Sequence, residues 1–295
     1  MDRIRRMTLM RHQYIYLCFG LLLFFTGCSE DNAYEASSST TAADSTGVTT
    51  LMTSRNDGKI SLAIDAESAS RSGVWIDLNG DGIRAKDASE DVKTFEDYVD
   101  YTLPEGLKKI TIHGNMTYLG CTADSLTAID VSADPYLKIL NCPQNKLTGI
   151  DVSKNSLLEK LDCSENRIST LDLSANTALL SLWCYNNKLN DLDISRLTNL
   201  ASLDCSGNQL TALDVTKNLL LERLLCYNNR ITALDLSKNP QLNRLWIFGN
   251  SFTENECAKI VVVLKNVVKG SLWMPEGKMD ETLKSSLSTK GWILQ

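Results

Sequence analysis

Histidine is scarce in this sequence, and its scarcity restricts the chemistry that the chain can perform. Of 295 residues, two are histidines, and one of them, His12, lies in a segment that we expect to be removed. The other, His113, is expected to have a structural or surface role. The sequence contains no G-x-S-x-G, no H-E-x-x-H, no phosphate-binding loop and no metal-spaced pair of cysteines. We therefore predict that the protein is not an enzyme, with an unrecognised hydrolase as the alternative.

An excess of basic residues is also missing. The chain has 30 Lys and Arg against 36 Asp and Glu, a net charge of −6. Residues 1–27 hold four Arg and one Asp, so their removal leaves 26 basic and 35 acidic residues, a net charge of −9. An acidic surface argues against nucleic acid as a partner and against general adhesion to anionic membranes.

No hydrophobic run is long enough to cross a bilayer. The most apolar segment, residues 14–25, is too short and follows four arginines, which predicts an export signal over residues 1–27. The run F-T-G-C that ends at Cys28 resembles the bacterial lipoprotein signal, in which this Cys becomes the lipidated N-terminus. The following S-E-D resembles the signal that sends Bacteroidetes-type lipoproteins to the outer face of the outer membrane. The alternative is an ordinary cleaved signal with an incidental Cys.

The next two segments differ in amino-acid composition and pattern. Residues 28–50 are rich in Ser, Thr, Ala and Asp, which predicts a flexible tether. Residues 51–105 alternate between apolar and polar side chains in places, which predicts a small β domain.

This β domain contains the run D-L-N-G-D-G, which matches the first half of a calcium loop. Its oxygen ligands would occupy positions 1, 3 and 5, with Gly at position 6. Position 12 is Ala88 instead of Glu, and the alternative is a polar turn at a strand end. The candidate ligands for Ca²⁺, the one cofactor that we consider, are Asp77, Asn79, Asp81 and Asp87.

Cysteine recurs at a fixed interval of 21 residues. Each of these cysteines follows a Leu by two residues, and all but the first precede an Asn by three; the first precedes Asp124. A period of this length indicates stacked supersecondary units. A single repeat position favours Cys as a small buried hydrophobe over a disulfide framework, so we predict free thiols. The six cysteines are Cys121, Cys142, Cys163, Cys184, Cys205 and Cys226.

The full unit is L-x-x-L-x-C-x-x-N-x-L-x-x-L-D-hydrophobic-S-x-N-x-x. It resembles the leucine-rich repeat L-x-x-L-x-L-x-x-N-x-L, with Cys at the third inward position. The far-side run L-D-V-S-K-N is similar to that of Bacteroidetes-type cell-surface leucine-rich repeat lipoproteins and, more distantly, of internalins. The resemblance implies a repeat solenoid over residues 106–252, with seven coils of 21 residues and a parallel β-sheet on the concave face. The Ile-Thr-Ile run at 110–112 predicts a strand that covers the first coil, because the end repeat would otherwise expose its core.

The remaining expectations concern the columns and the C-terminal end. The inward Asn of each unit is expected to bond backbone groups of its own turn and of the neighbouring coil. The column of Asp at 130, 151, 172, 193, 214 and 235 is expected to cap the following turns, with a cation-binding stripe as the alternative. A capping box at 253–256 predicts an α-helical C-terminal cap over residues 253–295, with Gly270 ending its first helix.

Alternation along each strand points the residues on either side of the Cys column away from the core, onto the concave face. Aromatic side chains gather there in the second half of the array, with arginines and carboxylates beside them. The alternative is that these aromatics pack on one another or beneath the C-terminal cap. The candidate ligand-binding residues are Trp183, Tyr185, Leu225, Tyr227, Trp246, Phe248, Arg223, Arg244, Asp162 and Asp204.

Aromatic and Arg side chains together are typical of protein-binding hot spots. We therefore expect a monomeric adhesin or receptor that is lipid-anchored at the cell surface and binds a protein through its concave face. A glycan-binding lipoprotein and a structural spacer without a dedicated ligand are the alternatives.

Overall fold

The computed structural model describes residues 47–295. The predicted export signal, Cys28 and most of the predicted tether lie outside the described residues. The described part of the chain forms a single compact unit, and none of its helices has the length and apolar character needed to cross a bilayer.

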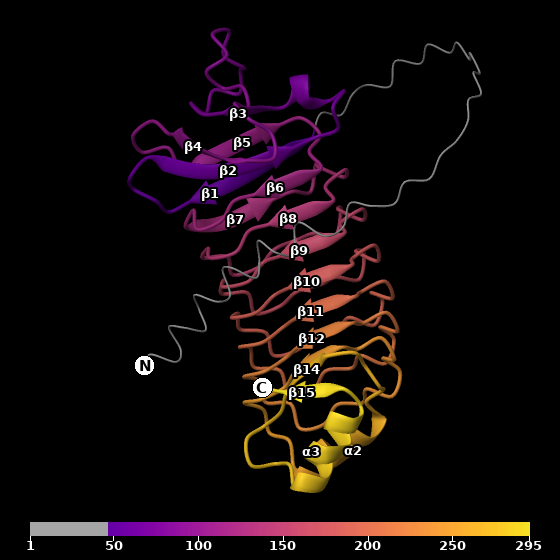
Figure 1. The fold of residues 1–295 in the computed structure, drawn as a ribbon. Helices are drawn as coiled ribbons and strands as arrows, with labels where there is room; N and C mark the ends of the chain where they lie inside the picture. Colours follow the sequence, from indigo (N-terminus) through magenta and orange to yellow (C-terminus); the bar gives the residue numbers. More distant parts are fainter. Residues whose placement is uncertain (1–46) are drawn as a thin grey trace, which may run out of the picture. The chain divides into compact units, whose positions relative to one another are not determined.

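The repeats stack as a parallel β-sheet, one short strand for every 21 residues (Figure 1). Equivalent positions pair between neighbours, so that Leu182 pairs with Leu161 on one side and Leu203 on the other. This register confirms the predicted leucine-rich repeat solenoid. The strands are β6 (Tyr118–Gly120), β8 (Ile139–Asn141), β9 (Lys160–Asp162), β10 (Ser181–Trp183), β11 (Ser202–Asp204), β12 (Arg223–Leu225) and β13 (Arg244–Trp246).

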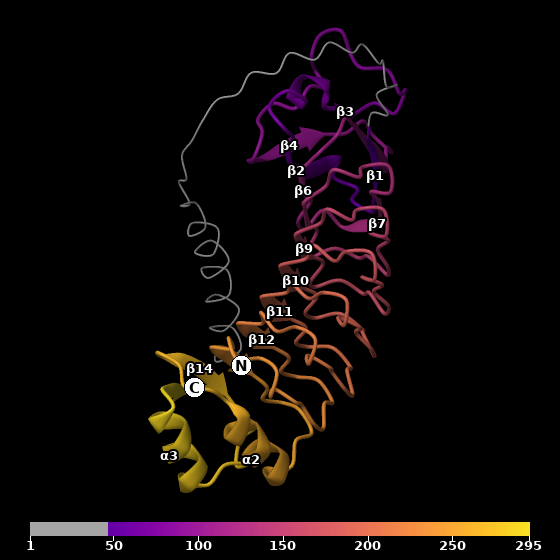
Figure 2. The ribbon, with the colours of Figure 1, turned by 90° about the vertical axis from the view of Figure 1, so that its right-hand side faces the viewer.

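The Leu and Cys of each strand point into the core, and all six cysteines of the column are fully buried and free. Burial raises the pKa of each thiol, which keeps it protonated and unreactive. The prediction of free, buried thiols is confirmed. Figure 2 shows the strands along one side of the stack and the far-side turns along the other.

The predicted asparagine ladder is present. The Asn166 amide Nδ2 donates to the carbonyl oxygens of Cys142 at 3.0 Å and Cys163 at 3.1 Å, and its Oδ1 accepts from the Leu147 N–H at 3.0 Å. The same bonds recur at the equivalent asparagines. Because a buried backbone group without a partner costs free energy, this ladder holds consecutive coils in register.

A second asparagine ladder, which the sequence analysis did not predict, runs along the far side. The Asn176 Nδ2 donates to the carbonyl oxygens of Val152 and Asn155, each at 2.9 Å. Asn155, Asn218 and Asn239 repeat the pattern. Hydrogen bonds from asparagine side chains therefore link neighbouring far-side turns as well as neighbouring strands.

The column of aspartates caps turns, as predicted. The Asp172 Oδ1, for example, accepts the Ser174 N–H at 2.9 Å, and the other five make the same bond. Hydrogen bonds from the Ser or Thr two residues later lower the pKa of these carboxyls. The part of the chain that the structure describes holds no cluster of His, Cys, Asp or Glu suited to a metal.

The N-terminal part forms two sheets that continue both sides of the first coil. On the strand side, β2 pairs antiparallel with β6 and carries β4 on its outer edge. On the far side, β7 pairs with β1 in a four-stranded sheet of order β3-β5-β1-β7. The elements are β1 (Val48–Thr53), β2 (Lys59–Asp65), the 3-10 helix η1 (Arg71–Gly73), β3 (Trp75–Asp77), β4 (Tyr98–Thr102), β5 (Lys109–His113) and β7 (Leu126–Asp130).

Two expectations for this region were wrong. The strand at 110–112 lies in β5, which pairs with β1 and β3. The first coil is instead covered by β1 and β2, because their edges match both of its open sides. In addition, β1 begins at Val48, within the range predicted as tether, since its alternating V-T-T-L-M-T sequence buries every second side chain.

The C-terminal part covers the other end with two helices and two more strands of the parallel sheet. Thr253 caps α2 (Glu254–Val263) by accepting from the Glu256 N–H, as predicted, and α3 (Glu281–Thr289) begins after Asp280. Gly270 does not end the first helix; it begins β14 (Gly270–Trp273), which pairs with β13. The final strand, β15 (Trp292–Leu294), pairs with β14.

Candidate functional site

The candidate site is the outward surface of the parallel sheet, called here the strand face. On it lie the side chains that flank the inward Leu and Cys of each strand. The parallel register places one row of them side by side across consecutive strands. In order, this row is Asp162, Trp183, Asp204, Leu225, Trp246 and Trp273.

Aromatic rings form a contiguous cluster at the C-terminal half of the strand face. Tyr227 stacks on Phe248 with ring centroids 4.5 Å apart, and Phe248 lies 4.2 Å from Trp273. Trp246 meets Trp273 edge-on at 5.7 Å, and its indole N–H donates to the Ser271 hydroxyl at 3.0 Å. Such contacts contribute about 0.5–1.5 kcal/mol each beyond the area that they bury, so they stabilise the arrangement of these rings.

Trp273 is the member of this cluster that the sequence analysis missed. A signal was present, because Leu272-Trp273 repeats the Leu245-Trp246 pair of the preceding strand. The spacing hid it: the 21-residue period is broken between β13 and β14, where α2 is inserted. Only the pairing of Trp246 with Trp273 shows that the row continues.

The aromatic side chains differ in exposure. Tyr185, Leu225 and Tyr227 are 6–8% exposed, whereas Trp183, Trp246 and Phe248 are half-buried. The premise that outward alternation leaves all these side chains open was therefore too simple. Mutual stacking, which the sequence analysis held as the alternative, accounts for part of the cluster.

Charged side chains flank the aromatics in a second row. Arg223 and Arg244 pair across β12 and β13, and Lys160 lies in the same row on β9. The Asp162 Oδ1 accepts the Ser164 N–H at 3.0 Å and the Ser164 hydroxyl at 2.6 Å, and burial raises the pKa of Asp162 to about 6 despite these bonds. The strand face thus combines basic and acidic groups around fixed rings.

The predicted calcium ligands follow β3, and each of the three carboxylates among them accepts a backbone N–H from its own loop. Both carboxylate oxygens of Asp77 accept backbone N–H groups of the loop, from Gly80 at 2.6 Å and Gly82 at 3.0 Å. Asp87 is exposed and accepts from the Ser89 N–H. The carboxylate that returns to the loop is that of Glu90, which is 2% exposed and accepts from the N–H groups of Leu78 and Ala85.

Asn79 and Asp81 bond each other at the rim of this loop, where the Asp81 N–H donates to the Asn79 Oδ1 at 2.8 Å. The bonds within the loop account for a polar turn after β3, and calcium binding stays a prediction.

His113 has a structural role. Its ring stacks on Trp75 with centroids 4.1 Å apart and an angle of 4° between the planes. The stack lies between β3 and β5, in the four-stranded sheet and not in the sheet that carries the strand face.

No family model matches the sequence, and no curated protein matches it. Several solved structures are similar to this chain. The functional domain of InlJ from Listeria monocytogenes, which includes a cysteine ladder, is 29% identical with a TM-score of 0.50, over 62% of this chain and 41% of that one. An internalin, InlF, of the same organism is 23% identical with a TM-score of 0.51, over 56% and 48%. A leucine-rich repeat protein of Leptospira interrogans is 20% identical with a TM-score of 0.49, over 58% and 52%.

The chain therefore spans less than half the length of either Listeria protein. Its described residues form a leucine-rich repeat solenoid with a parallel sheet. The repeats are internalin-like, and they resemble the InlJ domain in carrying a column of cysteines.

Proposed function

We propose that this protein is a non-enzymatic binding protein that holds a protein ligand on its strand face. The observation that carries the proposal is the contiguous aromatic cluster of Tyr227, Trp246, Phe248 and Trp273 beside Arg223. Rigid aromatics next to Arg are enriched among the residues that contribute most to protein interfaces, because little side-chain entropy is lost when they bind. An internalin-like leucine-rich repeat fold is consistent with this role.

The test is a pull-down of ligands with the purified protein, followed by affinity measurements on variants. Trp183→Ala and Trp246→Ala should each weaken binding of a recovered ligand at least tenfold, as expected for hot-spot aromatics. The matched control is Tyr136→Ala, because Tyr136 is an aromatic residue that is 51% exposed and lies outside the strand face. The assignment is wrong if both Trp variants bind every recovered ligand as tightly as the unmodified protein does.

A glycan ligand is the second candidate, and one arrangement favours it. Trp183 lies between Asp162 and Asp204 in the register, which places a carboxylate on each side of an aromatic ring. Such a combination suits a sugar, whose ring packs on the indole while its hydroxyls bond the carboxylates. A glycan array probed with the same purified protein separates the two candidates. If neither the pull-down nor the glycan array recovers a ligand, a role as a structural spacer is favoured.

We further propose that Cys28 is lipidated and anchors the protein to the outer membrane with the solenoid exposed. The support is the sequence F-T-G-C and the Ser- and Thr-rich segment that follows it. Cells fed radioactive palmitate should label the unmodified protein but not Cys28→Ser. Protease added to intact cells should remove the solenoid, and resistance would indicate a periplasmic location.

A further inference from the structure

The first position of the strand-side asparagine ladder holds an aspartate. In the other repeats the amide Nδ2 donates to the carbonyl oxygen three residues earlier in the chain, at 2.9–3.1 Å. The carbonyl of Cys142 consequently accepts two amides, from Asn145 and Asn166. The equivalent carbonyl of Cys121 accepts one, from Asn145. The aspartate is Asp124, and an ionised carboxylate cannot donate the second bond.

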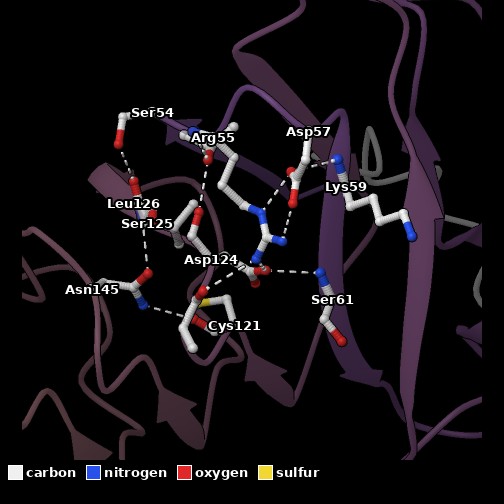
Figure 3. A network of polar contacts seen from close by, with 12 residues as sticks. Ser54, Arg55, Asp57, Lys59, Ser61, Cys121, Asp124, Ser125, Leu126 and Asn145 are labelled. Carbon is white, nitrogen blue, oxygen red and sulfur yellow. Dashed lines mark hydrogen bonds and ion pairs between the residues drawn. The ribbon is translucent and has the colours of Figure 1, made fainter.

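Asp124 otherwise reproduces the geometry of the ladder. Its Oδ1 accepts the Ser61 N–H of β2 at 2.9 Å, which is the role that the asparagine Oδ1 plays towards the preceding coil. Figure 3 shows Asp124 between Ser61 and the turn that begins at Cys121. By this correspondence, the Asp124 Oδ2 takes the place of the asparagine Nδ2. Asp124 is fully buried, and this Oδ2 has no hydrogen-bond partner among the described residues.

The charged groups around Asp124 do not compensate for its burial. Arg55 lies on the connection between β1 and β2, and its Nη1 is 4.0 Å from the Asp124 Oδ1 and donates to the Ala123 carbonyl oxygen at 3.3 Å. The Nε and Nη2 of the same guanidinium bond the Asp57 carboxylate. Burial raises the pKa of Asp124 to about 6; the Ser61 N–H and Arg55 oppose this rise, and Asp100 on β4 and Asp57 add to it. Burial of a carboxylate with an unsatisfied oxygen favours the neutral acid.

We propose that Asp124 takes up a proton in the folded protein and that its Oδ2–H then donates to the Cys121 carbonyl, which completes the ladder. Acidification thereby strengthens the junction between the N-terminal sheets and the repeat array. The proton comes from solvent, and the N-terminal sheets contribute the Ser61 N–H that fixes the other oxygen. Between the pKa of an unfolded Asp and that of Asp124 in the fold, the folded state binds more protons, so stability rises as the pH falls.

A second buried carboxyl, Asp134, lies at the far side of the same junction. Its two oxygens accept the Met116 N–H at 3.2 and 3.3 Å, and burial raises its pKa to about 7 against these bonds. It changes stability in the same direction as Asp124. Both oxygens of Asp134 already have a partner, however, so a proton there completes no missing bond. The test must therefore isolate Asp124.

The decisive variant is Asp124→Asn, which places a permanent donor where the proposal places the proton. Urea unfolding of the purified protein is compared with that of the variant at pH 7.5 and pH 5.5. The change in pH should shift the unfolding equilibrium constant of the unmodified protein about fourfold relative to the variant, as proton linkage requires for a folded pKa of about 6. The variant should also be the more stable of the two at pH 7.5. Asp130→Asn, a substitution of an exposed carboxylate in the same repeat, is the matched control and should run parallel to the unmodified protein.

A carboxyl ¹³C NMR titration of the unmodified protein provides a measurement that needs no variant. Asp124 should titrate with a midpoint near pH 6. A midpoint below pH 4.5 overturns the proposal, as does a difference between unmodified protein and Asp124→Asn that stays constant from pH 7.5 to pH 5.5.

Discussion

The inward and outward sides of the same strands follow different rules. Leu182 in β10 and Cys184 just after it are fully buried, and both match the residues one period away in the neighbouring coils. Between them, Trp183 has Asp as its neighbour on both sides. Every coil presents the same environment inward, so inward residues repeat. Outward residues do not share that repeated environment, and they vary from coil to coil. The variation on the outward side is where a ligand surface can arise.

The largest expected effect comes from the core side of this comparison. Leu182→Ala should lower the free energy of unfolding by about 2–5 kcal/mol, because it removes fully buried side-chain atoms and leaves a cavity between coils. Chemical denaturation measures the loss. Ser181→Ala, one residue away on the outward side, is the control and should change stability by less than about 0.5 kcal/mol. Equal losses of unfolding free energy in the two variants would mean that the inward and outward sides contribute equally to stability.

Next in size is the effect of removing one rung of the ladder. Asn187→Ala deletes a bond from the Ile168 N–H at 2.9 Å and three bonds to carbonyl oxygens, and it leaves that buried N–H without a partner. The expected loss is about 1–3 kcal/mol, measured by urea unfolding. Asn190→Ala, at an exposed position in the same coil, should be close to neutral. A neutral Asn187→Ala would show that the ladder does not contribute to stability.

A side chain is expected to be unfavourable at the glycine on the turn after β11. Gly207 has φ +64°, and a Cβ there would lie 2.2 Å from the Asn186 Oδ1. Gly207→Ala should therefore cost about 1–2 kcal/mol from the left-handed backbone alone, with the clash in addition. Gly149 has no atom within 4 Å of the corresponding Cβ position, so Gly149→Ala is the control. Thermal melting of both variants decides the point, and similar melting temperatures would contradict it.

The smallest effect should come from the exposed aspartate column. Bonds from Ser174 lower the pKa of Asp172, so its contribution to stability is present above the unfolded pKa of 3.8 and is lost as the pH falls below it. The free energy of unfolding of Asp172→Asn should therefore fall slightly less between pH 4 and pH 2.5 than that of the unmodified protein. Between pH 5.5 and pH 7.5 the two proteins should show the same dependence on pH. Acid titrations of both proteins, monitored by circular dichroism, measure this difference. A change near neutral pH would contradict the assigned capping role.

Calcium binding by the loop after β3 is a separate prediction. Calorimetric titration of the purified protein with calcium should show binding, and EDTA should lower the melting temperature if the site is occupied as purified. Glu90→Gln is the informative variant, because Glu90 and not Asp87 returns to the loop. If calorimetry shows no heat of calcium binding and EDTA leaves the melting temperature unchanged, the loop is a polar turn without calcium.

Much of this architecture was predictable because it repeats. The positions of Leu, Cys and Asn at a fixed period identified the strands, the core column and the strand-side ladder. The second ladder was missed, although Asn155 and its equivalents recur in the same period, because the far-side run was treated as a capped turn. Asp124 was recognised as a departure from the pattern, but its partner, Ser61, lies 63 residues earlier in the chain. No periodic pattern could have identified that contact.

The repeat, the identity of each inward column and the side of the sheet on which the aromatics lie can all be predicted from the sequence. These properties follow from neighbouring coils alone, and each coil offers its neighbour the same surface. The ends of the array are known only from the fold: β2 and β1 cover the first coil, and β14 adds Trp273 to the aromatic cluster. The ends require pairing between segments with no shared period, and such pairing depends on which edges and buried groups meet in space.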